Sequence, residues 1–93
     1  DAERIAWIAK LIEETDEVIQ EAYTVSQIEQ TNKKTPCEAM NEVMQEARKR
    51  LAMELTDVKT LCESWLYADG WDEEQRGDLQ RCVNEKNRER GYF

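Results

Sequence analysis

Proline and glycine interrupt this chain in very few places. Among its 93 residues there is one proline, Pro36, and glycine occurs only at positions 70, 77 and 91. A sheet of many strands needs frequent turns, and those turns draw on proline and glycine. The uninterrupted stretches are rich in Ala, Leu, Glu, Gln, Lys, Arg and Met, which favour helix. The sequence therefore predicts an all-α fold.

The first predicted helix covers residues 2–29. Its apolar residues recur at three- and four-residue steps, which is the spacing of one helix face. A polar stretch, QTNKKT, follows it and is expected to form a loop. The predicted face consists of Ile5, Ile8, Leu11, Ile12, Val18, Ile19, Ala22, Val25 and Ile28.

The second predicted helix covers residues 36–68. Thr35 is expected to be its N-cap, with Pro36 at the first helical position and Glu38 at the reciprocal capping position. Gly70 is expected to end it in a left-handed conformation. Its predicted seam is Met40, Met44, Ala47, Leu51, Leu55, Val58, Cys62 and Trp65. Trp65 is therefore predicted to belong to the core.

A third, shorter helix is predicted over residues 73–90, with Asp72 as its N-cap and Gln75 as the reciprocal partner. The predicted architecture is one domain, residues 1–93. It is an antiparallel helical hairpin plus this shorter helix, an elongated three-helix bundle. Taking the loop centre near residues 32–33, the acidic run 13–17 should lie level with the basic run 48–50.

More apolar residues are present than this bundle can cover, because the third segment offers few of its own. The residues outside the predicted seams are Trp7, Tyr23, Val43, Met53, Leu61 and Leu66. A second copy covering them, in a homodimer that forms a larger bundle, is the favoured interpretation. The alternative is a monomer with ordinary scattered surface hydrophobes.

Composition excludes several classes of function. The chain has no histidine, which removes the usual general base and the commonest metal ligand. Glutamates four residues apart, as in Glu13/Glu17 and Glu17/Glu21, are expected to be a solvated face. We therefore predict no enzyme activity, no cofactor and no metal site. A formal net charge of −8 argues against direct nucleic-acid binding, and no apolar run is long enough to span a membrane.

The three cysteines lack the spacing of zinc or redox motifs. Cys62 and Cys82 lie nearly level across the second turn, so they are the pair predicted to bridge if a disulfide forms. Cys37 lies too far along the helix and is expected to be a free thiol or to link two chains. The compartment is not determined by the sequence, and a cytoplasmic location is favoured over secretion because three free thiols suit it.

The remaining function is protein interaction. We expect an acidic helical adaptor or regulator that binds a partner protein through an apolar face, with the net charge of −6 on residues 1–30 influencing partner choice. The alternatives are a secreted, disulfide-stabilised ligand or toxin-like factor, and an acidic inhibitor that mimics nucleic acid. The candidate interaction residues are Trp71, Tyr67, Trp7, Glu13, Glu14, Asp16 and Glu17.

Overall fold

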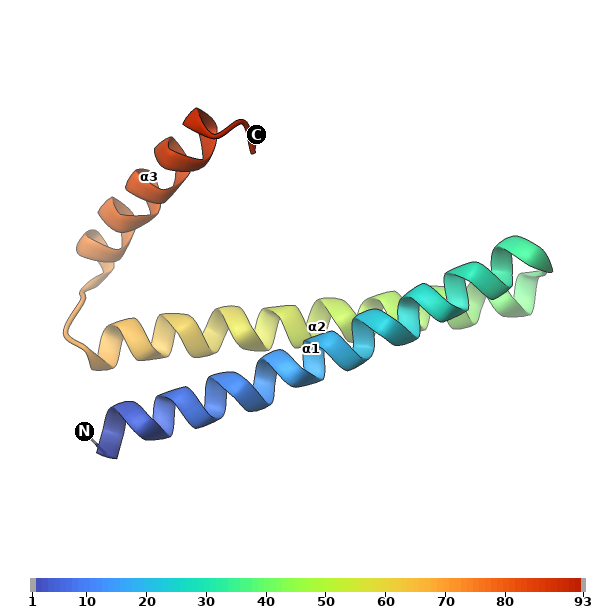
Figure 1. Ribbon diagram of the computed structural model, residues 1–93, viewed down its shortest axis with the longest axis horizontal. Helices are drawn as coiled ribbons and strands as arrows, with labels where there is room; N and C mark the ends of the chain where they lie inside the picture. Colours follow the sequence, from blue (N-terminus) through green and yellow to red (C-terminus); the bar gives the residue numbers. More distant parts are fainter. Residues whose placement is uncertain (1, 93) are drawn as a thin grey trace. The chain divides into compact units, whose positions relative to one another are not determined.

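Three helices form the protein, as the computed structural model, which describes residues 2–92, shows (Figure 1). They are α1 (Ala2–Lys34), α2 (Glu38–Ala68) and α3 (Glu73–Glu89). No strand occurs among the described residues. The predicted all-α class, with a hairpin and a shorter third helix, is confirmed. Contacts divide the chain into two compact units, Asp1–Leu61 and Cys62–Phe93. The prediction of a single domain stays a prediction.

The turn of the hairpin lies further along the chain than predicted. Helix α1 continues to Lys34, and the Thr35 amide still donates to the Thr31 carbonyl at 3.0 Å. Lysines 33 and 34 lie in the last turn, where cations favour the negative end of the helix dipole. The predicted loop QTNKKT is therefore almost wholly helical.

The predicted N-cap of α2 is wrong for the same reason. Thr35 extends the last turn of α1, and Cys37 is the N-cap of α2. The Cys37 Sγ accepts a hydrogen bond from the Met40 amide at 3.4 Å. The Cys37 carbonyl accepts the first helical bond, from the Asn41 amide at 3.0 Å. Pro36 precedes the cap and has no amide to leave unpaired. Helix α2 thus begins two residues later than predicted.

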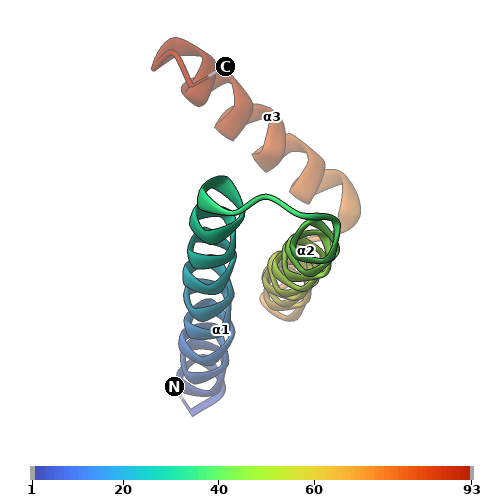
Figure 2. The same cartoon turned by 90° about the vertical axis from the view of Figure 1, so that its right-hand side faces the viewer.

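Helices α1 and α2 lie side by side and antiparallel, joined by this short turn (Figures 1 and 2). On each helix a series of buried and half-buried positions alternates in steps of four and three, which is the seam of a coiled coil. Val25, Met44 and Ala47 are the most buried, and Ala47 has no exposed surface. The α1 seam is Trp7, Leu11, Glu14, Val18, Glu21, Val25, Ile28 and Asn32, and the α2 seam is Met40, Met44, Ala47, Leu51, Glu54, Val58 and Leu61.

The α2 seam departs from the predicted one after Leu51. The strict alternation of steps selects Glu54 and Leu61, which are half-buried. It leaves Leu55 51% exposed and Cys62 exposed. The prediction favoured Leu55 and Cys62 because they are apolar, but each lies one residue beyond the seam position, while Val58 belongs to both series. A carboxylate therefore occupies the seam at Glu54.

The predicted register between the two helices is also wrong. Arg48 Nη2 lies 2.7 Å from Glu29 Oε2, and Arg50 Nε lies 3.7 Å from Glu21 Oε2. The basic run therefore contacts later acids of α1 than expected, because the turn is displaced along the chain. The acidic run 13–17 instead lies near Glu54.

In the second unit, local chemistry determines the turn between α2 and α3. Gly70 has φ 93°, and the Trp71 amide donates to the Leu66 carbonyl at 3.0 Å, which is a Schellman ending. Asp72 then caps α3 with the reciprocal Gln75 contact, at 2.8 and 2.9 Å. The left-handed glycine and the capping box are confirmed as predicted. Trp65, predicted to be core, is half-buried.

Candidate functional site

The outer face of α1 carries a row of large apolar side chains that remain exposed. At about 100° of rotation per residue, all of them fall within an arc of about 60°, and the row extends for about 27 Å. Thr15 and Ala22 are small residues at the intervening positions. This row, called the isoleucine stripe below, is Ile5 (64% exposed), Ile8 (45%), Ile12 (64%), Ile19 (53%) and Tyr23 (69%).

The isoleucine stripe is not part of the hairpin seam. Its centre lies about 140° around α1 from the residues that face α2, by the same helical geometry. The sequence prediction placed these isoleucines and the seam residues on one face, because three- and four-residue steps connect both sets. The structure separates them into two rows, and the exposed row contains no charged residue.

A shallow hollow lies in the C-terminal half of the stripe. It is lined by Ile19, Ala22, Tyr23 and Ser26. Residues at i, i+3, i+4 and i+7 form the four-cornered hole that receives one side chain of a facing helix in a coiled coil. This hole is free of charge. A comparable hollow on α2 includes Glu42, Glu46 and Arg50 in its lining.

Three acidic residues of the predicted interaction set lie near the stripe or behind it. Asp16 is exposed, lies about 20° outside the stripe, and accepts from Gln20 Nε2 at 2.7 Å. Glu13 follows on the same side, with 59% of its side chain exposed. Glu17 lies further around the helix, between the stripe and the seam that faces α2. The stripe therefore has an acidic edge, defined here as Glu13 and Asp16.

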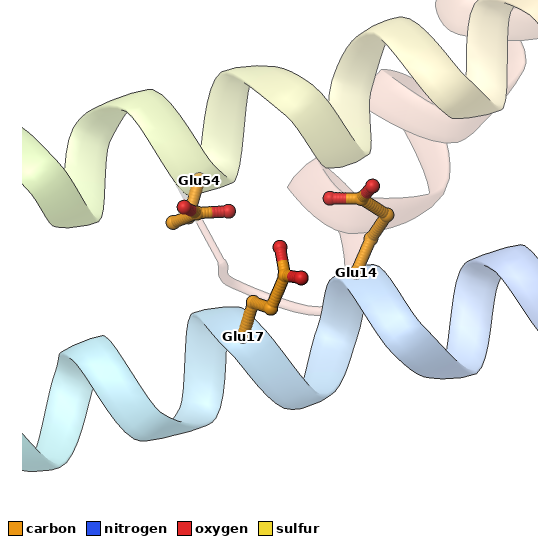
Figure 3. Close-up of side chains that lie close together, drawn as sticks. All are labelled: Glu14, Glu17 and Glu54. Carbon is orange, nitrogen blue, oxygen red and sulfur yellow. The ribbon is translucent and has the colours of Figure 1, made fainter.

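Glu14 and Glu17 of α1 meet Glu54 of α2 between the two helices (Figure 3). One carboxylate oxygen from each lies within 4.8 Å of the others. Glu14 Oε2 and Glu54 Oε2 are buried and have no hydrogen-bond partner. The other Glu14 oxygen, Oε1, lies 3.3 Å from Lys10 Nζ. Three carboxylates with one nearby ammonium group leave unbalanced negative charge in the seam.

This charge alters proton affinities. The hydrogen bond with Glu54, followed by the charge of Glu14, raises the pKa of Glu17 above its usual range. The hydrogen bond with Glu14 likewise raises the pKa of Lys10. Carboxylate oxygens are also ligands that hard divalent cations accept.

The aromatic pair predicted as a contact surface lies in the second unit. Tyr67 is 74% exposed and Trp71 41% exposed, and both line a shallow hollow at the Gly70 turn. Arg76 contacts this turn through the main chain, because its Nη1 donates to the Trp71 carbonyl at 2.6 Å. Its Nε donates to Glu63 Oε2 at 3.1 Å. Arg76 thus braces the turn.

Other predicted residues are placed as follows. Trp7 is half-buried in the α1 seam, away from the isoleucine stripe. Cys37, Cys62 and Cys82 carry free, exposed thiols, and the Cys62–Cys82 bridge stays a prediction.

The sequence prediction missed the isoleucine stripe and Glu54 as candidate site residues. The signal for the stripe was present as two interleaved heptad series on α1, at positions 5, 12 and 19 and at positions 11, 18 and 25. Either series alone predicts a helix, so the prediction treated both series as one apolar face.

Comparison with family models, with curated proteins and with solved structures finds no match to this chain. Within residues 2–92, none of the helices has the length and apolar character needed to cross a membrane.

Proposed function

We propose that this chain is a helical protein-interaction module, which binds a helix of another polypeptide through the isoleucine stripe of α1. The observation that supports the proposal most is the exposure of the stripe. Four isoleucines and a tyrosine on one arc remain 45–69% exposed, although the same helix buries its other face against α2. Contiguous exposed apolar rows of this kind mark interaction sites more often than scattered single residues do.

The shape of the stripe favours a helix as its occupant. A narrow row whose apolar residues lie three, four or seven positions apart matches the seam of a two-helix contact, whereas a buried helix is apolar over a wider arc. The uncharged hole at Ile19, Ala22, Tyr23 and Ser26 suits one apolar side chain from such a helix.

The energetics favour occupation as well. Full burial of an isoleucine contributes about 1.5–3 kcal/mol, so covering the exposed half of each stripe residue contributes on the order of 1 kcal/mol. Five such residues contribute on the order of 5 kcal/mol, and the apolar side chains of the partner helix add their own burial against the ordering costs of association.

A site-specific photocrosslinking experiment tests this proposal. A benzophenone amino acid replaces Ile12 in one variant and Val43, which is 48% exposed on α2, in a matched control. Irradiation in native extract should give a discrete protein adduct at position 12 and none at position 43. Equal labelling at both positions, or no adduct at position 12, would refute binding through the stripe.

A further inference from the structure

We infer that the helix bound by the isoleucine stripe is a basic amphipathic helix of a different protein, not a second copy of this chain. This inference rests on the proposed function and specifies its partner. It is carried by the charges that surround the stripe, together with the symmetry that self-pairing would impose.

The acidic edge is the first observation. Glu13 and Asp16 are exposed beside the stripe between Ile12 and Ile19, near its middle. Residues 1–30 contain eight acids and two bases, a net charge of −6. Lysine or arginine on the flank of an incoming helix would therefore meet acids along one side of the contact.

Nearby bases of the hairpin do little to neutralise this edge. Lys10 Nζ lies 3.3 Å from Glu14 and 3.5 Å from Glu13, so one ammonium group serves two carboxylates. Arg48 and Arg50 of α2 contact Glu29 and Glu21, further along α1. The region around Asp16 therefore keeps a negative potential that a basic helix can neutralise.

Pairing with a second copy would cover the apolar residues of the stripe but would not neutralise the acidic edge beside it. An antiparallel copy centred on Ile12 would place Ile5 level with the partner's Ile19, since both lie seven residues from the centre. An antiparallel two-fold contact of this kind, however, brings each edge against the same edge of the other copy. Acidic edge would then face acidic edge, between two chains that each carry a net charge of −8.

Two synthetic peptides provide the test. Each is a three-heptad helix with leucine at the seam positions, and the flanking positions are lysine in one and glutamate in the other. Binding to the full chain is measured by fluorescence anisotropy at low and high salt. We expect the lysine peptide to bind about tenfold more tightly, because two or three exposed ion pairs together provide a factor of that size. The preference should shrink at high salt.

Charge-reversal variants locate the effect. Asp16→Lys should remove most of the preference for the lysine peptide. Glu42→Lys makes the same change in net charge at an exposed position of α2 and should leave the preference intact. A preference that survives Asp16→Lys, or that Glu42→Lys reduces equally, would overturn the assignment to the acidic edge.

The remaining outcomes separate this inference from the proposed function. If both peptides bind equally and Ile12→Ser weakens both, the stripe is a binding site but the partner need not be basic, and the inference fails alone. If sedimentation equilibrium shows a dimer that Ile12→Ser dissociates, a second copy is the occupant and the inference fails. If neither peptide binds and Ile12→Ser changes nothing, both the inference and the proposed function fail.

Discussion

The two faces of α1 differ in where their charged residues lie. The face that packs on α2 includes Glu14, Glu21 and Asn32 among its eight seam positions, whereas the isoleucine stripe has no charged residue. The polar content of the inner face has structural consequences, since Glu14 Oε2 and Asn32 Oδ1 are both buried without a hydrogen-bond partner. This helix therefore carries an apolar row on its exposed face as well as on its packed one.

This difference indicates that the stripe is not needed for the hairpin itself. A helix that needed only α2 would place its isoleucines in the seam and its glutamates outside. Under the proposed function, a helix of another protein covers the isoleucines that remain outside. The inner face should therefore determine stability, and the outer face should determine binding.

The largest expected effect comes from placing the same polar residue on each face. Val25→Asn puts an amide at a position only 6% exposed and should lower the free energy of unfolding by about 3 kcal/mol. Ile19→Asn on the stripe, 53% exposed in the parent, should change it by less than about 1 kcal/mol. Urea unfolding followed by circular dichroism measures both. Similar losses for the two variants would break the distinction between the faces.

An intermediate effect is expected from making the inner face more apolar. Glu14→Leu removes a carboxylate whose Oε2 is buried without a partner and should raise the free energy of unfolding by about 1 kcal/mol. The loss of the exposed contact with Lys10 offsets only a small part of this gain. Glu13→Leu, one residue away and exposed, should give no comparable gain. A loss of stability in Glu14→Leu would show that its carboxylate stabilises the seam.

A smaller effect concerns pH. Because the folded-state pKa of Glu17 is raised, mainly by its hydrogen bond with Glu54, this group favours the folded state at acidic pH. Its contribution is fully present below the unfolded pKa and is lost as pH rises through the folded pKa. Glu54→Gln should therefore flatten the dependence of the melting temperature on pH between the unfolded-state pKa of Glu17 and its raised folded-state pKa. The exposed control Glu46→Gln should retain the parent's slope, and parallel curves for all three proteins would argue against the coupling.

Local signals in the sequence were sufficient for the second unit. The left-handed Gly70 and the reciprocal Asp72–Gln75 cap both involve residues within a few positions of each other, so the sequence specifies them directly. Helix existence was likewise predictable from periodicity and from the scarcity of proline and glycine.

Non-local features of the hairpin were not predictable in the same way. The register depends on where α1 ends, and continuation to Lys34 moved the partners of Arg48 and Arg50 to Glu29 and Glu21. The seam at Glu54 depends on strict heptad continuity, which overrides the preference for an apolar residue at that step. The two rows of α1 share the same periodicity, and only their different exposure separates them.

The smallest expected change in stability provides the most direct test of the central claim. That claim is that the isoleucine stripe binds a partner helix and contributes little to the stability of the fold. Ile12→Ser leaves the charge of α1 unchanged and removes a side chain that is 64% exposed. Urea unfolding and titration with the lysine-flanked peptide should be measured on the same preparation. We predict a free energy of unfolding within about 0.5 kcal/mol of the parent and an affinity at least about tenfold weaker. A stability loss comparable to that of Val25→Asn, with unchanged affinity of the folded molecules, would contradict the account.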